Sequence, residues 1–350
     1  MPEHAPADIT VSNRFDLIRL LLAAGVFAYH AIALAEIAPS GSLERGLGQL
    51  AEVSIQGFFI VSGALVAGSL ARASSLADYA GKRIRRLWPA YAVIIIVPAA
   101  ISLALTRDGY GVASYTLANL SFLNFLEPNL PGLFAQNRFT EVNGALWTLK
   151  IEVMFYLALP LILLLLSWLR GLWWLGIFVL YAAGEAWAIV LPYAFAESLG
   201  PELGRQLPGQ MAYFAMGIAL WKVEPVLRGR WLACAIPGMF LLAASLLDPM
   251  LAPLRALGLA GLLAGFAFAP GPALSPARFG DISYGVYITH FPILQAMVAA
   301  GLASKLGPVG FLSAATLVVI AASFALWHLV EKPALRPSSH YRKVASRVTR

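Results

Sequence analysis

The chain has 350 residues, of which 59% are apolar and only 12% are charged. Soluble domains carry about twice that charged fraction, so the composition excludes a disordered chain and an ordinary soluble enzyme. The formal net charge is +7, but the basic residues lie at the ends of apolar runs, which argues against nucleic-acid binding. The single cysteine, Cys234, excludes an internal disulfide and a cysteine-based metal cluster. The five histidines show no metal-binding spacing, so we expect no metal site.

Ten hydrophobic runs follow one another along the chain. They occupy residues 15–37, 51–70, 88–106, 142–168, 172–192, 208–222, 230–247, 255–269, 282–301 and 309–331. A membrane helix needs ~20 largely apolar residues, so the sequence predicts an all-α polytopic membrane protein with about ten transmembrane helices. We expect one domain over residues 1–335. A basic cytoplasmic tail over 336–350 is expected to lie against anionic lipid head groups.

The basic residues indicate the orientation of these runs. With both termini cytoplasmic, most of the 25 Lys and Arg residues fall in cytoplasmic connections, including 71–87, as the positive-inside rule requires. The longest outside connection is then 107–141. The first run also resembles a signal peptide ending near residues 33–35, but its length and its polar residues favour a retained membrane helix.

The first run carries Arg19 and His30, which are eleven residues apart. In an α-helix this spacing is roughly 16 Å along the axis and returns to nearly the same face. Ionisable groups inside a membrane are costly and therefore usually have a partner or a function. An imidazole suits proton abstraction from a hydroxyl near neutral pH. The alternatives are a packing role for His30 and an interfacial anchor for Arg19.

Two arginines precede the third run. Arg83 and Arg86 stand at i and i+3 and therefore share a helix face. Arginine side chains match phosphate oxygens with two parallel hydrogen bonds, so the pair is a candidate phosphate site. An orientation signal with lipid contact is the alternative. In the second run, the small residues of 57–63 predict close contact with another helix.

Glu152 in the fourth run and His290 in the ninth are the next candidates. Tyr156 lies on the same side of its helix as Glu152, and Tyr287 on the same side as His290. Glu152 is suited to orient a histidine, to hold a substrate hydroxyl or to neutralise a buried arginine. Pro292 weakens the helix after His290, and such breaks commonly line cavities. The alternative for His290 is a packing histidine bonded to a freed carbonyl.

These residues together resemble the motifs of membrane acyltransferase family 3, the bacterial integral-membrane O-acyltransferases that modify saccharides and related acceptors. The resemblance covers nearly the whole chain. The matching positions are Arg19 and His30 (R-x10-H); 57–63 (a glycine-aromatic segment); Arg83 and Arg86 ahead of Pro89 and Tyr91 (R-x-x-R); Leu146, Trp147, Leu149, Glu152, Phe155 and Tyr156 (L-W-x-L-x-x-E-x-x-F-Y); Ser283, Tyr284, Tyr287, His290 and Pro292 (S-Y-x-x-Y-x-x-H-x-P); and Glu331 before Pro333. One departure is Lys150, where many members carry Ser.

The resemblance implies a bacterial inner-membrane enzyme with no permanently bound cofactor. Its acyl donor would be acyl-CoA, with acetyl-CoA favoured, reached from the cytoplasm. Its acceptor would be a hydroxyl of a saccharide or lipid-linked saccharide. The resemblance implies the following roles: Arg19, Arg83 and Arg86 bind the donor; His30 is the general base; Glu152 and His290 complete the catalytic set; and Trp147, Tyr156 and Tyr287 support the acceptor site.

Two other classes of function fit the buried polar residues less well. A transporter or flippase would use the His and Glu side chains as a substrate or proton path, but transporters often show internal repeats and this chain shows none by eye. A scaffold without chemistry leaves the midplane ionisable groups unexplained. In the last run, His328 and Glu331 stand at i and i+3 and are expected to form a local pair.

Overall fold

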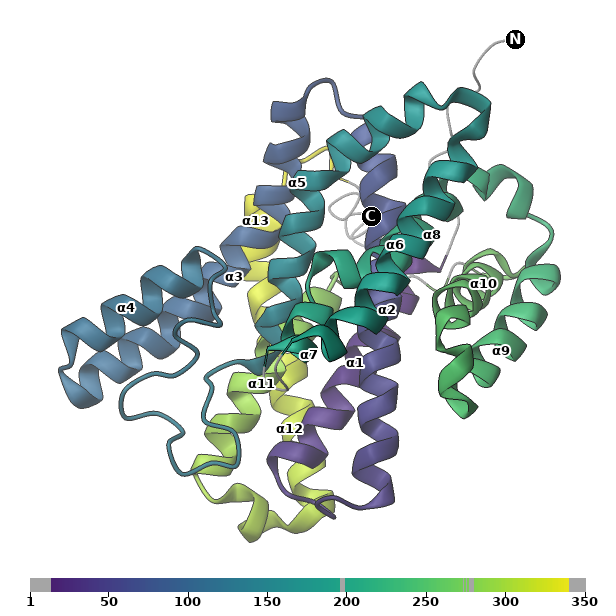
Figure 1. Cartoon of the computed structure of the whole chain (residues 1–350). Coiled ribbons are helices and arrows are strands. Elements are labelled where there is room, and N and C mark those ends of the chain that lie inside the picture. The colour runs from purple at the N-terminus through teal and green to yellow at the C-terminus, as the bar shows by residue number, and fades with distance from the viewer. Residues whose placement is uncertain (1–13, 196–198, 273, 275, 277–279, 340–350) are drawn as a thin grey trace. The chain divides into compact units, whose positions relative to one another are not determined.

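The computed structural model describes residues 14–195, 199–272, 274, 276 and 280–339. Within these residues all regular secondary structure is helical, which confirms the all-α prediction (Figure 1). Every predicted hydrophobic run lies on a helix. The ten helices are α1 (Phe15–Leu34), α2 (Ser42–Ala71), α3 (Leu76–Thr106), α5 (Trp147–Trp168), α6 (Trp173–Ala194), α8 (Leu207–Leu227), α9 (Trp231–Leu247), α10 (Arg255–Phe268), α11 (Ser283–Ala299) and α12 (Leu302–Leu326).

Seven helical segments in the described part of the chain are long and apolar enough to cross a membrane, by length and composition. They begin with α1, α2 and α3 and continue with 144–168, 170–194, 249–268 and 302–334. Helix α9 is a shorter apolar helix of 17 residues. The polytopic architecture is thus confirmed, while the count of ten spans and the cytoplasmic termini stay predictions.

Several shorter elements were not predicted. They are α4 (Gly109–Leu120), α7 (Gly200–Gly204), α13 (Lys332–Ala334), the 3-10 turns η1 (Gly144–Leu146), η2 (Arg170–Leu172) and η3 (Pro249–Leu254), and the π-helical turn η5 (Trp327–Glu331). Helix α4 lies inside the predicted connection 107–141. The carboxylate of Asp108 caps its first turn by accepting from the backbone N–H of Gly111 at 2.9 Å, and the hydroxyl of Tyr91 donates to the carbonyl of Asn119 at its end.

The chain divides into two compact units, each built from segments that are distant in sequence. The first unit contains residues 1–19, 55–79 and 151–275, and the second contains 20–54, 80–150 and 276–350. Both units therefore draw on several of the predicted hydrophobic runs.

In the first unit, glycines bring helix backbones close together. A Cβ on Gly63 of α2 would lie 2.5 Å from the carbonyl oxygen of Phe214 in α8, so a larger side chain has no room there. A Cβ on Gly258 of α10 would lie 2.5 Å from the backbone nitrogen of Leu242 in α9, and these two helices run side by side in Figure 1. The close contact predicted from the small residues of 57–63 is confirmed.

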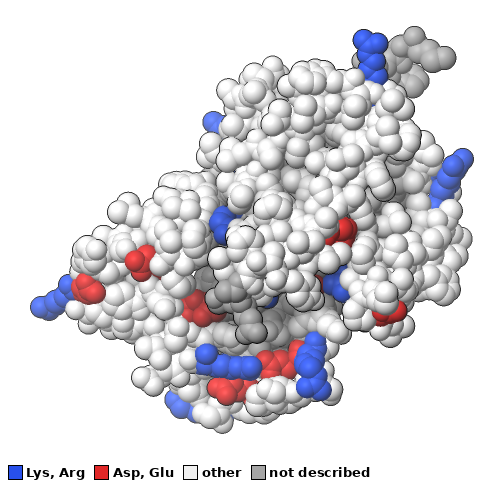
Figure 2. Space-filling view, in the orientation of Figure 1, with Lys and Arg blue, Asp and Glu red and all other residues white. Residues whose placement is uncertain are grey.

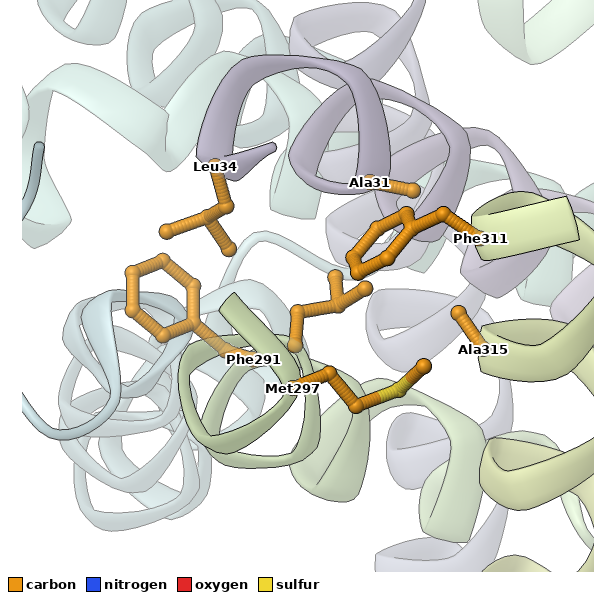
Figure 3. Close-up of a cluster of buried hydrophobic side chains, with 7 residues drawn as sticks. Ala31, Leu34, Phe291, Met297, Phe311 and Ala315 are labelled. Atoms are coloured by element: carbon orange, nitrogen blue, oxygen red, sulfur yellow. The ribbon is translucent and has the colours of Figure 1, made fainter. Parts of the chain in front are cut away.

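In the second unit, α1, α11 and α12 share an apolar core (Figure 3). Its buried members are Ala31 and Leu34 from α1, Leu294, Phe291 and Met297 from α11, and Phe311 and Ala315 from α12. Helix α1 therefore contributes to this core, and its retention as a membrane helix stays a prediction. The same packing sets one face of α1 against α11 and so positions the polar residues next to it.

Apolar side chains also cover much of the outside of the helices. Leu157 of α5, Phe178 of α6 and Leu317 of α12 are 77%, 64% and 69% exposed. Figure 2 shows that charged side chains are sparse on the face drawn. Large exposed apolar surfaces are rare on soluble monomers, and they fit helices that face lipid.

Candidate active site

Helices α1 and α11 bring His30 and His290 into contact. Nδ1 of His30 lies 2.9 Å from Nε2 of His290, and the two rings are stacked with centroids 5.0 Å apart. His290 is fully buried, while His30 is half-buried. The sequence predicted each residue as a candidate, but residues 260 positions apart give no local signal of a contact. The structure thus joins the two histidines into one pair.

Aromatic side chains surround the histidine pair. The ring of Phe291 packs edge-on to His30 at 5.1 Å, and Phe27 packs edge-on to His290 at 6.3 Å. Tyr29 also contacts His30, with ring centroids 5.1 Å apart. This apolar surrounding disfavours a lasting charge on either imidazole.

The second ring nitrogen of His290 is bonded to its own helix. Its Nδ1 lies 2.9 Å from the carbonyl oxygen of Val286, one turn earlier. A continuous hydrogen-bonded chain therefore runs from the α11 backbone through His290 to His30. The ring of His30 is half-buried and is also hydrogen-bonded to the backbone of Val26, one turn earlier in α1.

Pro292 does not break α11, which continues through it to Ala299. Proline has no N–H, so the carbonyl of Ile288 lacks its usual helical partner. The side chain of Asn143 donates to this carbonyl at 2.9 Å, and its own oxygen accepts from the backbone N–H of Ala145 at 3.2 Å. Asn143 thereby fixes the start of η1 against α11 beside the histidine pair. The helix thus continues through Pro292, as the run 282–301 predicted, and Asn143 bonds the freed carbonyl.

Tyr287 extends the contact between α11 and the start of α5. Its hydroxyl lies 2.6 Å from Oγ1 of Thr148, and this Oγ1 donates to the carbonyl of Ala145 at 3.1 Å. Trp147 and Lys150 are half-buried in the same turn of α5. The ammonium of Lys150 lies 4.6 Å from the ring centroid of Phe125 in the connection after α4.

The predicted arginine pair separates into two environments. Arg86 is buried, and its Nη1 and Nη2 each lie 2.6 Å from a carboxylate oxygen, the first of Glu331 and the second of Asp281. The hydroxyl of Ser283 donates to the other oxygen of Asp281 at 2.7 Å. Arg83 lies one turn earlier in α3 and is half-buried. We call Arg86, Asp281 and Glu331 the carboxylate cluster.

The carboxylate cluster changes two expectations. Both terminal nitrogens of Arg86 are bonded to carboxylates, so they do not present the open fork that an isolated arginine offers to a phosphate. The expected local pair of His328 with Glu331 is replaced by the bond from Arg86 to Glu331, and the ring of His328 stacks on Phe324. Glu331 ends the π-helical turn η5, a geometry that is frequent at functional sites.

In the first unit, Glu152 accepts hydrogen bonds from two hydroxyl groups. Ser62 of α2 donates at 2.7 Å and Tyr156 donates at 2.5 Å, both to Oε1. The hydroxyl of Tyr79 donates in turn to the backbone carbonyl of Tyr156 at 3.1 Å. Glu152 and Tyr156, which the sequence places on the same side of the helix, are thus hydrogen-bonded.

Arg19 is half-buried in α1, which runs without interruption through both Arg19 and His30.

Sequence reasoning did not single out Ser62, Asn143, Thr148 or Asp281. Asn143 had a usable signal, because Asn is a preferred residue immediately before a helix. Asp281 stands similarly two residues before the start of α11. Ser62 and Thr148 are recognisable only through their distant partners. Among the described residues no group of three His, Cys, Asp or Glu side chains is arranged to hold a metal ion.

Comparison with known families decides the class of protein. The family model described as an acyltransferase domain, acyltransferase 3, matches residues 12–328. The chain belongs to this family. It is therefore an acyltransferase, and its apolar helices make it a multi-pass membrane protein. The transporter alternative is set aside by this match.

Three curated relatives extend over most of the chain. Nodulation protein 10 of Rhizobium leguminosarum bv. viciae is 28% identical over 93% of each chain. An O-acetyl transferase of Shigella phage Sf6 is 26% identical over 94% of this chain and 97% of its own. Exopolysaccharide production protein ExoZ of Rhizobium meliloti (strain 1021) is 28% identical over 80% of this chain and 88% of its own. No solved structure matches.

Proposed function

We propose that the protein is an O-acyltransferase that moves an acyl group, acetyl in the first instance, from acyl-CoA to a hydroxyl of a saccharide or lipid-linked saccharide. The contact between His30 and His290 is the observation that carries this proposal. A half-buried imidazole that is held by hydrogen bonds and surrounded by aromatic rings is suited to accept a proton from a hydroxyl. The names of two relatives, an O-acetyl transferase and an exopolysaccharide production protein, support the acyl group and the acceptor class.

His30 is the general base in this proposal. Its imidazole removes the proton of the acceptor hydroxyl as the oxygen attacks the acyl carbonyl. A positioned base of this kind typically contributes ~10²–10⁴ in rate. Trp147, Tyr156 and Tyr287 are assigned to support of the acceptor site, and Glu152 is assigned to hold or polarise a hydroxyl.

Arg83 is the main ligand for the phosphates of acyl-CoA, with Arg19 as a second donor-binding residue. Arg86 joins them in the same motif, but both of its terminal nitrogens are bound to carboxylates. We therefore assign Arg86 to the support of the donor site rather than to the phosphates themselves. Arg83 lies in the basic segment 82–86, where the positive-inside rule favours the cytoplasm and its acyl-CoA.

The proposed location is the bacterial inner membrane, with both termini in the cytoplasm. In this orientation the donor is bound from the cytoplasmic side. The tail 336–350, of which 340–350 lies outside the described residues, then faces anionic lipids on the same side.

The test measures transfer of labelled acetyl from acetyl-CoA by the purified full chain in lipid. Wild type is compared with His30→Ala and with the matched control His328→Ala, which removes an imidazole that stacks on Phe324. We expect His30→Ala to lose ~10²–10⁴ in transfer rate. The control His328→Ala should keep the wild-type transfer rate. Equal activity of wild type and His30→Ala contradicts the role of His30.

The acceptor is tested in cells of a bacterial host. Surface glycans are compared by mass spectrometry with the gene present, absent or carrying His30→Ala. The proposal predicts acetyl groups on saccharide hydroxyls only with the wild-type gene. Acetylation of another class of small molecule, with unmodified glycans, contradicts the saccharide acceptor.

A further inference from the structure

The hydrogen-bonded chain through the two histidines determines where each proton lies. A backbone carbonyl oxygen only accepts, so Nδ1 of His290, 2.9 Å from the carbonyl of Val286, must carry the proton. In a neutral imidazole the other nitrogen then has no proton and is an acceptor. Nε2 of His290 therefore accepts a hydrogen bond.

The position of the proton on His290 determines the position of the proton on His30. Nδ1 of His30 lies 2.9 Å from the acceptor Nε2 of His290, so Nδ1 of His30 is the donor of that bond. In neutral His30 the lone pair is thus left on Nε2, the nitrogen that faces away from His290. The backbone carbonyl of Val26, one turn before His30 in α1, also accepts from the His30 ring, so the carbonyls of Val286 and Val26 both act on the histidine pair.

We propose that His290 is a positioning residue that holds His30 in the tautomer with its proton on Nδ1, so that Nε2 is the basic atom of the reaction. The proposal deepens the proposed function and rests on it for the identity of the base. His290 itself is fully buried, and both of its ring nitrogens are engaged by Val286 and His30. It therefore acts through His30 and not on the substrate.

A second imidazole has a physical advantage over a carboxylate in this place. In the Ser-His-Asp triad a buried aspartate holds the catalytic histidine in the correct tautomer. A carboxylate within an apolar helical protein carries a large desolvation penalty unless it is paired. A neutral histidine held by a backbone carbonyl fixes the same tautomer without a buried charge, and the surroundings of Phe27 and Phe291 are compatible with it.

The proton and electron pairs balance along this route. The O–H bond of the acceptor breaks, its proton forms a bond with Nε2 of His30, and its electron pair forms the new bond to the acyl carbon. The carbon–sulfur bond of acyl-CoA breaks, and the sulfur receives the proton from Nε2. While His30 is protonated, its Nδ1–H donates a charge-assisted hydrogen bond to Nε2 of His290, which stabilises the cation.

The first test reads the tautomer directly in the wild-type full chain. The histidines are labelled with ¹⁵N, the protein is placed in lipid bilayers, and the spectrum is recorded by solid-state NMR at a pH where both rings are neutral. Samples of His30→Gln and His290→Gln assign the signals. We expect a proton on Nδ1 and none on Nε2 for both histidines. A proton on Nε2 of His30 overturns the proposal, and no variant has to be active for this test.

The second test separates positioning from packing. His290→Leu removes the acceptor, and His290→Gln keeps a side-chain oxygen that can accept from Nδ1 of His30. Because a catalytic histidine in the wrong tautomer loses ~10⁴ in kcat in the Ser-His-Asp triad, we expect His290→Leu to lose roughly 10²-fold or more in kcat with an unchanged KM for acetyl-CoA. His290→Gln should recover at least tenfold of that loss, and the matched control His328→Leu should keep wild-type turnover.

The outcomes distinguish this inference from the function on which it rests. Equal losses in His290→Leu and His290→Gln, or a loss confined to KM, contradict a positioning role. If His30→Gln keeps its turnover while the NMR spectrum shows the expected tautomers, the assignment of the base fails and the bonding pattern stands. If His30→Gln is inactive while His30 carries its proton on Nε2, the base stands and the proposal for His290 fails.

Discussion

The second unit contains two polar groups in apolar surroundings, the carboxylate cluster and the histidine pair. They differ in whether they carry charge. The carboxylate cluster uses full charges: Arg86 binds Glu331 and Asp281, each at 2.6 Å. The histidine pair carries no necessary charge, and its hydrogen bonds lead to the backbone carbonyl of Val286. Both groups join segments that are far apart in sequence. The cluster occupies both terminal nitrogens of Arg86, whereas the bond within the pair occupies only Nδ1 of His30.

The difference indicates which group is built for stability and which for chemistry. In the carboxylate cluster the terminal nitrogens of the arginine are occupied, and removal of one partner leaves a buried charge without its counter-ion. In the histidine pair, the half-buried His30 has a second ring nitrogen that His290 does not occupy. We therefore expect mutations in the cluster to act mainly on folding and mutations in the pair mainly on rate.

The largest effect on stability is expected for Arg86→Ala. Breaking a buried ion pair typically costs ~3–5 kcal/mol, because the remaining charges lose their partner. The triple variant Arg86→Met, Asp281→Asn, Glu331→Gln removes all three charges and should recover most of that loss. Chemical unfolding in detergent measures both. Wild-type stability of Arg86→Ala contradicts the structural role of the cluster.

Arg83→Ala should have the opposite signature. Loss of a charged hydrogen bond to phosphate costs ~1.5–3 kcal/mol, or roughly 10- to 150-fold in affinity for acetyl-CoA. Its loss of stability should be smaller than that of Arg86→Ala, because Arg83 is only half-buried. Calorimetric titration with CoA is the measurement, and Arg85→Ala, an exposed neighbour, is the control. Unchanged CoA affinity in Arg83→Ala assigns this residue to membrane orientation instead.

The hydrogen bond from Asn143 to the carbonyl of Ile288 can be tested together with Pro292. Asn143→Leu leaves the carbonyl of Ile288 without a partner, which costs ~1–3 kcal/mol. Pro292→Ala restores an N–H that can bond this carbonyl within the helix. The double variant should therefore be less destabilised than the sum of the single variants. Strict additivity in this double-mutant cycle shows that the two sites are not linked through Ile288.

A smaller effect is expected for Ser62→Ala in the first unit. The carboxylate of Glu152 keeps its bond from Tyr156, so the loss of one of two hydroxyl donors should cost about 1 kcal/mol. Thermal unfolding of this variant is compared with that of wild type. A loss of more than about 3 kcal/mol would show that Ser62 is needed for more than this hydrogen bond.

Much of the fold was predictable from the sequence because a membrane imposes a simple rule on it. Each apolar run long enough to span has to satisfy its own backbone, and the helix is the way to do so. All ten predicted runs lie on helices, and seven helical segments among the described residues are long and apolar enough to span. Helix α4 was not predicted, because its 12 residues are too few to span a membrane and its ends are held by Asp108 and Tyr91.

The candidate site was predictable as a set of residues but not as a set of contacts. His30 and His290 each attract attention as imidazoles inside apolar runs, and Glu152 and Tyr156 are linked by helix periodicity. The partners of Arg86 come from positions 195 and 245 residues away, and no local pattern predicts them. A sequence motif therefore groups Arg83 with Arg86, whereas packing separates them.

The most direct test of the account measures acetyl transfer by His30→Gln as a function of pH. This variant keeps a polar side chain of similar reach but has no titratable nitrogen. The account predicts that it binds acetyl-CoA like wild type and loses ~10²–10⁴ in rate. It also predicts that the wild-type rate falls as the pH drops below the pKa of the base, because only the neutral imidazole takes a proton. A His30→Gln variant with most of the wild-type turnover, or a wild-type rate that rises as the pH falls, would contradict His30 as the base.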